Sequence, residues 1–240
     1  MVKPLTFAHT PQIFFGPGTI ELLPREIHKM GTCPLILTGR SFFINTALWP
    51  DLQQNLEADH LTWHHALVER EPSPRMIDEI LKIYKDSPID VVVAIGGGSV
   101  IDAGKAVSAM RCHPLGVKAY LEGVGNEKPT GKKIPFIAVP TTAGTGSEAT
   151  KNAVLSEIGA QGFKKSLRHD NYVPNVAIVD PTLAITCSPA ITASSGMDAF
   201  TQLLESYLST KGNSLTDALA LEGLLSVREG LIPVYEDGKI

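Results

Sequence analysis

Four short apolar runs constrain the fold of this chain more than any other feature of its sequence. They are rich in Val, Ile and Leu, do not alternate with polar residues, and lie at residues 33–38, 91–95, 134–139 and 175–179. Strands covered on both faces of a parallel sheet have this pattern, because neither row of side chains meets water. Residues 65–68 predict a further strand.

Helical patterns lie between these runs. Residues 73–85 begin with Ser73 as a predicted N-cap and Pro74 in the first turn, and residues 99–110 directly follow the 91–95 strand. The apolar residues of the first pattern fall on one helix face: Met76, Ile77, Ile80, Leu81 and Tyr84. Strands that alternate with helices predict an α/β fold with a doubly wound parallel sheet.

The pattern changes after Pro181. Residues 189–209 and 214–228 read as consecutive helices with no strand between them. We therefore expect an α/β domain over residues 1–185 and the first helices of an all-helical domain over residues 186–240. A helical segment this short is difficult to stabilise alone, so the sequence suggests a truncated domain.

Composition excludes several classes of partner. The 240 residues carry a net charge of −4 with a pI near 6.0, which argues against a nucleic-acid-binding protein. The amino terminus lacks the apolar core of a secretory signal, and no apolar run is long enough to span a bilayer. The widely spaced Cys33, Cys112 and Cys187 fit thiols in a reducing compartment, so we expect a cytoplasmic protein with no membrane or nucleic-acid partner.

Residues 96–99, Gly-Gly-Gly-Ser, lie where a predicted strand meets a predicted helix. Glycines allow a tight turn close to a ligand, and the helix amino terminus would direct N–H groups toward a phosphate. The standard dinucleotide pattern fails because Ile101 occupies its last small position, and the P-loop pattern fails because Ala106 follows Lys105. A tight turn without a ligand is the alternative.

A second polar segment, Pro-Thr-Thr-Ala-Gly-Thr-Gly-Ser-Glu at residues 140–148, follows the next predicted strand. Its hydroxyls, glycines and carboxylate are unsuited to a core and suit a loop that hydrogen-bonds a nucleotide. An ordinary Gly/Thr-rich connection is the alternative.

Together these segments resemble the iron-containing, or group III, alcohol dehydrogenases. The resemblance also includes Phe-Gly-Pro-Gly at 15–18, Asp102, Asn-Val-Ala-Ile-Val-Asp-Pro at 175–181 and Gly-Met-Asp-Ala-Phe-Thr at 196–201. It implies a Rossmann-like domain followed by an all-helical metal-binding domain, with the active site between them. The implied activity is metal-dependent, NAD(P)-linked hydride transfer to or from a small alcohol or aldehyde, in a homodimer.

The resemblance also assigns cofactor-binding residues. It implies that Gly97, Gly98, Ser99 and Asp102 lie on the pyrophosphate and nicotinamide side. Three hydroxyl residues would belong to the loop over the nicotinamide half, namely Thr141, Thr142 and Thr145. Lys164 matches a lysine that contacts the cofactor ribose, with a solvated surface lysine as the alternative.

Cofactor choice depends on the residues that follow the first core strand. NAD-preferring relatives often carry an aspartate there, whereas this chain has Gly39, Arg40 and Ser41. Glycine removes the repulsion toward a 2′-phosphate, and Arg40 and Ser41 offer it hydrogen-bond donors. The sequence therefore favours NADP over NAD, although Arg40 pointing to solvent is the alternative.

The resemblance implies a divalent metal, Fe or Zn, held by an aspartate and three histidines. Asp198 matches the aspartate and is our candidate catalytic residue, but Gln202 stands where the first histidine is expected. A carboxamide is a weaker ligand than imidazole for either metal. The other two histidines would lie beyond Ile240, and surface or capping roles are the alternatives for Asp198 and Gln202.

Two further functions stay open at this point. An enzyme similar to glycerol dehydrogenase or dehydroquinate synthase would share the architecture. A cofactor-binding module without turnover is suggested by Gln202 and the absent histidines. The complete 140–148 and 196–201 motifs favour the alcohol dehydrogenase or aldehyde reductase.

Overall fold

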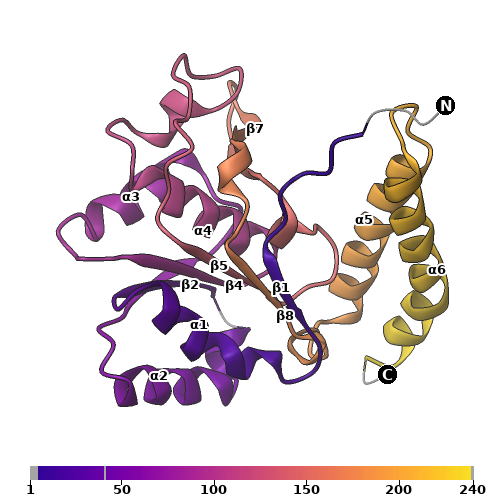
Figure 1. Ribbon diagram of the computed structural model, residues 1–240, viewed down its shortest axis with the longest axis horizontal. Helices are drawn as coiled ribbons and strands as arrows, with labels where there is room; N and C mark the ends of the chain where they lie inside the picture. The colour runs from indigo at the N-terminus through magenta and orange to yellow at the C-terminus, as the bar shows by residue number, and fades with distance from the viewer. Residues whose placement is uncertain (1–4, 41, 239–240) are drawn as a thin grey trace. The chain divides into compact units, whose positions relative to one another are not determined.

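The computed structural model describes residues 5–40 and 42–238, shown as a ribbon in Figure 1. Contacts divide them into two units. An α/β unit comprises Thr10–Thr141 and Ser147–Pro181. A helical unit comprises the residues after Pro181, the short segment Thr142–Gly146, and the amino-terminal residues through His9.

The α/β unit is built on a six-stranded parallel sheet in the order β1-β8-β5-β4-β2-β3. The strands are β1 (Gln12–Phe15), β2 (Pro34–Gly39), β3 (His64–Val68), β4 (Val91–Gly96), β5 (Phe136–Pro140) and β8 (Val176–Val179). Strands β4 and β5 are buried along their whole length, which explains their unbroken apolar sequences. The predicted fold class and the five predicted strands are therefore confirmed.

Helices cover both faces of this sheet. Figure 1 shows α3 (Pro74–Ile83) and α4 (Gly98–Met110) on one side, and α1 (Leu23–Met30) and α2 (Leu48–Ala58) on the other. The predicted N-cap of α3 is confirmed, because the Ser73 hydroxyl accepts a hydrogen bond from the Met76 N–H at 3.2 Å. Every residue of α4 from Val100 to Met110 is buried, so this helix forms the centre of its layer.

A separate antiparallel hairpin, not anticipated from the sequence, consists of β6 (Asn152–Glu157) and β7 (Phe163–Arg168). Its buried side chains, Ala153, Leu155 and Leu167, join the core that surrounds α4. Short 3₁₀ turns connect the larger elements at Thr19–Leu22, Phe43–Asn45, Val117–Tyr120, Ser147–Ala149, Asp170–Tyr172 and Pro181–Ala184.

The helical unit contains α5 (Pro189–Tyr207) and α6 (Ser214–Glu236), which pack against each other. Side chains cap both amino termini: Ser188 accepts from the Ile191 N–H at 3.3 Å, and Asn213 forms a capping box with Thr216. A Cβ added to Gly196 would lie 2.2 Å from Leu231 Cδ1, so this glycine permits the close approach of the helices. No helix in the described ranges is long and apolar enough to cross a membrane.

Candidate cofactor site

The strand order places a topological switch point between β2 and β4. From β2 the chain proceeds to β3 on one side, and then crosses to β4 on the other side of β2. Ligands of open α/β sheets bind outside the carboxyl ends of the strands at such a point. Gly39 ends β2 there, and a Cβ added to it would lie 3.8 Å from Val100 Cγ2 in the first turn of α4.

The glycine turn after β4 leads directly into α4. Gly97 is the N-cap residue, and its carbonyl oxygen accepts from the N–H groups of Val100 and Ile101 at 2.9 and 3.1 Å. Side chains cap α3, α5 and α6, but no side-chain cap hydrogen bond forms at the amino terminus of α4, as is also the case for α1 and α2 among the described residues. The amino terminus of α4 therefore keeps backbone donors and its positive dipole end for an anion.

Gly96 is required by close packing. A Cβ at this position would lie 2.5 Å from Val100 Cγ2, which is too close for any other residue. The Gly96 carbonyl also accepts from the Thr141 N–H at 3.0 Å, so the start of the loop after β5 is tied to the turn after β4. The structure thus brings Thr141 beside the predicted phosphate-binding turn.

Asp102 lies beneath this turn and is engaged by the protein itself. One carboxylate oxygen accepts from the Ser147 hydroxyl, and the other accepts from the Val154 N–H at 3.0 Å. Lys105 Nζ lies 3.7 Å from Asp102 and donates to the Ser147 and Asn152 carbonyls at 2.8 and 2.7 Å. This network holds the loop after β5 against α4; contact between Asp102 and a cofactor stays a prediction.

Burial disfavours the charged form of both ionisable groups in this network. Burial raises the pKa of Asp102, and the nearby charge of Lys105 only partly offsets this. Burial also lowers the pKa of Lys105 to about 8, and the nearby charge of Asp102 only partly offsets that change. The sequence placed Ser147 within the predicted nucleotide-binding segment 140–148 without a role of its own, and it did not identify Lys105 as part of the site. The available signal was a lysine three residues after Asp102 in a helix that is otherwise largely apolar.

Arg40 follows Gly39 and has an acidic neighbour. Its Nη2 lies 3.5 Å from Glu69 Oε1, and the two side chains are 73% and 52% exposed. Arg40 is therefore paired with Glu69. Ser41, the third residue predicted for this subsite, lies outside the described residues.

Lys164, on β7, is paired rather than free. Its Nζ lies 3.1 Å from Glu71 Oε1, while the Ser156 hydroxyl donates to Glu71 Oε2 at 2.8 Å. The hydrogen bond from Ser156 has the largest effect on the pKa of Glu71, and the contact with Lys164 has the next largest. Both hold this pKa below its ordinary value. The Ser156 N–H also donates to the Pro72 carbonyl at 2.9 Å, so the hairpin is fixed to the loop that precedes α3.

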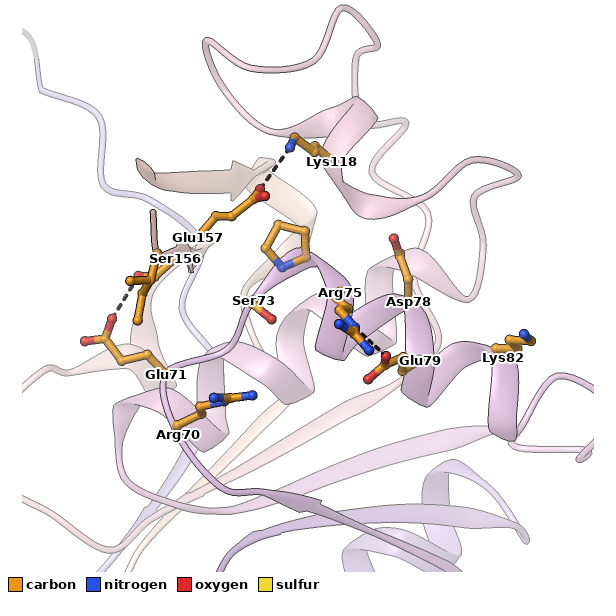
Figure 2. A pocket seen from close by; sticks show the side chains of 12 residues that line it. Arg70, Glu71, Ser73, Arg75, Asp78, Glu79, Lys82, Lys118, Ser156 and Glu157 are labelled. Atoms are coloured by element: carbon orange, nitrogen blue, oxygen red, sulfur yellow. Dashed lines mark hydrogen bonds and ion pairs between the residues drawn. The ribbon is translucent and has the colours of Figure 1, made fainter. Parts of the chain in front are cut away.

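A groove of about 790 Å³ lies beside this contact, between α3, the 3₁₀ turn at Val117–Tyr120 and the end of β6 (Figure 2). Figure 2 shows its ion pairs, Lys118–Glu157 at 2.9 Å and Arg75–Glu79 at 2.7 Å. None of the residues predicted to bind cofactor lines this groove. Its charges are largely compensated within the protein, and no residue of the predicted phosphate turn is among its lining residues.

In the helical unit, Asp198 and Gln202 are exposed on one face of α5, as their spacing predicts. Gln202 Nε2 donates to Asp198 Oδ2 at 2.9 Å. The described ranges contain no group of three or more His, Cys, Asp or Glu side chains that could hold a metal. One carboxylate and one carboxamide do not fit a complete site for Fe or Zn, which needs more donors.

Thr142 and Thr145 lie in the segment Thr142–Gly146, which makes its contacts within the helical unit, whereas Thr141 belongs to the α/β unit. The structure thus divides the three predicted threonines between the units. Their shared role at the nicotinamide stays a prediction.

Comparisons with known proteins agree with this arrangement. The sequence model described as "Iron-containing alcohol dehydrogenase" matches residues 10–181. "Alcohol dehydrogenase 4" of Saccharomyces cerevisiae is 33% identical over 232 residues, which cover 95% of this chain and 59% of that protein. The "NADPH-dependent butanol dehydrogenase" of Clostridium saccharobutylicum is 30% identical over 98% of this chain and 60% of its own length.

A solved structure shares the fold over nearly the whole chain. The sulfoacetaldehyde reductase of Bifidobacterium kashiwanohense, determined in complex with NAD⁺, matches with a TM-score of 0.86 and 30% identity. The match covers 98% of this chain and 62% of that protein. The chain therefore spans about three fifths of the length of these similar proteins.

Proposed function

Since this chain belongs to the iron-containing alcohol dehydrogenase family, we propose that the protein is an oxidoreductase that transfers hydride between NAD(P) and a small alcohol or aldehyde. One observation carries the cofactor half of this proposal. The amino terminus of α4 lacks a side-chain cap and lies at the switch point of the sheet, directly after the glycine turn.

Each predicted cofactor residue has a defined task in this proposal. Backbone N–H groups of Gly97, Gly98 and Ser99 bind the pyrophosphate, and Gly39 and Arg40 lie beside the adenosine ribose; a role of Ser41 at this ribose stays a prediction from the sequence. The remaining residues, Asp102, Thr141, Thr142, Thr145 and Lys164, contact or position the other parts of the cofactor. The bound nicotinamide supplies the hydride chemistry, and the protein supplies binding and orientation.

The helical unit belongs to the same proposal. We assign residues 1–185 to the cofactor domain and residues 186–240 to the first helices of an all-helical, metal-binding domain. No residue of α5 is buried, and large apolar side chains are exposed on both helices, including Met197, Tyr207, Leu219 and Ile232. Such apolar surface supports further packing partners for these helices.

For the metal, we propose Asp198 and Gln202 as two donors to Fe or Zn, with Asp198 as the catalytic contact. The described residues do not complete the coordination. Metal content measured for wild type and Asp198→Ala tests this assignment without depending on turnover.

We propose that the protein forms a homodimer and that it is located in the cytoplasm. β1 is an edge strand of the sheet, and its Ile13 and Phe15 side chains are 52% and 74% exposed. An exposed apolar edge strand favours pairing with another chain. Cys33, Cys112 and Cys187 are free thiols, which supports a reducing compartment.

The test combines nucleotide binding with turnover of butyraldehyde and propanol, using NADP and NAD in turn. Hydride transfer, followed by nicotinamide absorbance, supports the dehydrogenase. Binding without transfer to any short alcohol or aldehyde would favour the module without turnover. Oxidation of glycerol in preference to propanol would favour the glycerol dehydrogenase branch.

A further inference from the structure

We propose that Glu69 is a specificity-determining residue that weakens binding of the 2′-phosphate of NADP(H) by competing for Arg40. This inference rests on the proposed function, because it places the adenosine ribose at the carboxyl end of β2. It assigns a role to an acidic residue that the sequence did not single out. Its consequence is that the preference for NADP expected from Gly39 and Arg40 is reduced.

Strand register places the two side chains together. β2 and β3 are parallel neighbours, and their last paired residues are Gly39 and Val68. The next residue on each strand end is therefore Arg40 on one and Glu69 on the other. Their charged atoms, Arg40 Nη2 and Glu69 Oε1, lie 3.5 Å apart.

The subsite that contains this pair lies beside the switch point, on the β3 side of β2. Gly39 approaches Val100 in the first turn of α4, and the amino terminus of that helix has no side-chain cap. A dinucleotide whose pyrophosphate binds this helix terminus extends its adenosine ribose toward the end of the neighbouring strand, β2. Arg40 and Glu69 are then the charged groups that meet the 2′ position.

Charge decides between the two cofactors at this point. A 2′-phosphate must take Arg40 from Glu69 and must also approach the Glu69 carboxylate, which repels it. The ribose of NAD(H) carries no such charge, and Glu69 can accept hydrogen bonds from its hydroxyls. Gly39 offers no carboxylate at the end of β2, where NAD-preferring relatives often carry an aspartate. Glu69, directly after β3, thereby provides a carboxylate at this subsite instead.

The pair is suited to mutation because both side chains are substantially exposed. Exposed ion pairs contribute little to stability, so Glu69→Gln is expected to fold as wild type does. A matched control exists in Glu122, which lies 3.7 Å from Arg168, with exposures of 51% and 46%. Glu122→Gln removes one charge from a similar pair and therefore controls for the change in net charge.

The experiment measures dissociation constants of NADP⁺ and NAD⁺ by isothermal titration calorimetry for wild type, Glu69→Gln and Glu122→Gln. Glu69→Gln is expected to bind NADP⁺ about tenfold more tightly, with NAD⁺ binding unchanged or slightly weaker. The gain should shrink in 0.5 M salt, and it should be smaller in an Arg40→Ala background, where Glu69→Gln relieves only the direct repulsion of the 2′-phosphate. An unchanged NADP⁺/NAD⁺ ratio, or a gain that is equally large without Arg40, would overturn the role of Glu69 as a competitor for Arg40.

Failure of the proposed function would look different. If wild type binds neither nucleotide, the cofactor assignment itself is refuted. If wild type binds both and Glu69→Gln merely matches Glu122→Gln, only the inference about Glu69 is refuted.

Discussion

Lys105 extends from α4 to the loop after β5 and donates a hydrogen bond to the Ser147 carbonyl oxygen at 2.8 Å. The same ammonium donates to the Asn152 carbonyl at 2.7 Å and to the Thr150 hydroxyl at 3.0 Å. Because its side chain is only 1% exposed, no water replaces these partners. One lysine thus fixes the end of the polar loop to the helix that bears the phosphate turn.

Replacing Lys105 with Met is expected to lower the free energy of unfolding at pH 7 by about 3–5 kcal/mol. The substitution leaves carbonyl acceptors without their donor and removes the positive charge nearest to buried Asp102. Urea denaturation of both proteins measures the difference. A loss below about 1 kcal/mol would show that the network contributes little.

The stability gap between wild type and Lys105→Met is expected to widen from pH 8 to pH 10. Burial lowers the pKa of Lys105 from 10.5 to about 8, so in this range the unfolded chain binds more protons than the folded protein. Stability contributed by this residue therefore rises with pH. Urea denaturation at pH 7, 8, 9 and 10 follows the gap, and a gap that narrows would contradict the pKa shift.

Replacing Gly98 with Asp is expected to weaken NADP⁺ and NAD⁺ binding by about 100-fold or more, because the new carboxylate occupies the end of α4 that we assign to pyrophosphate. Calorimetry measures both affinities. Gly98→Ala separates charge from bulk, since it adds a Cβ without a charge. Equal affinities for wild type and Gly98→Asp would refute the phosphate turn.

The parts of the fold that could be predicted are those in which the local sequence is compatible with only one type of secondary structure. The run Val91–Gly96 is buried on both faces, so its composition alone identifies a central strand. Ser73 followed by Pro74 likewise defines the start of α3 without reference to the rest of the chain. The turn at Gly96 was predictable because it joins two such elements.

Other elements lacked a comparable local signal. β7 has the sequence Phe-Lys-Lys-Ser-Leu-Arg, in which only Leu167 is buried, and α2 buries only Leu52 and Leu56. β1 is a four-residue edge strand with no buried residue. Their positions depend on long-range packing, which outweighs local propensity in such short segments.

Charged neighbours in the site depend on register between strands that are distant in sequence. Glu69 meets Arg40 because Val68 pairs with Gly39, and Glu71 meets Lys164 because the hairpin packs against the loop before α3. Neither pairing follows from the spacing of these residues along the chain. Sequence therefore indicated where the cations lie, but not which carboxylates compensate them.

Replacing Gly196 with Ala is expected to destabilise the helical unit by about 1–3 kcal/mol, because its methyl group would overlap Leu231. Gly230 in α6 is the matched control, since a Cβ there has no neighbour within 4 Å. Gly230→Ala should instead stabilise by about 0.5–1 kcal/mol through helix propensity. Urea denaturation compares both variants, and equal effects would show that Gly196 is not a packing requirement.

Replacing Gln202 with His is expected to tighten Zn²⁺ binding by about tenfold or more, because imidazole is a better ligand than a carboxamide. Gln202 now donates an N–H to Asp198, and ligating a metal through its carbonyl oxygen would cost it that hydrogen bond. Histidine presents a nitrogen lone pair from the same helix face. Competition with a chromophoric chelator measures the Zn²⁺ affinity. Asp198→Asn is expected to weaken Zn²⁺ binding, whereas the control Glu222→Gln, at an exposed position of α6, should leave it unchanged. Zn²⁺ affinities that are the same in the Asp198 and Glu222 variants would show that this face of α5 does not bind the metal.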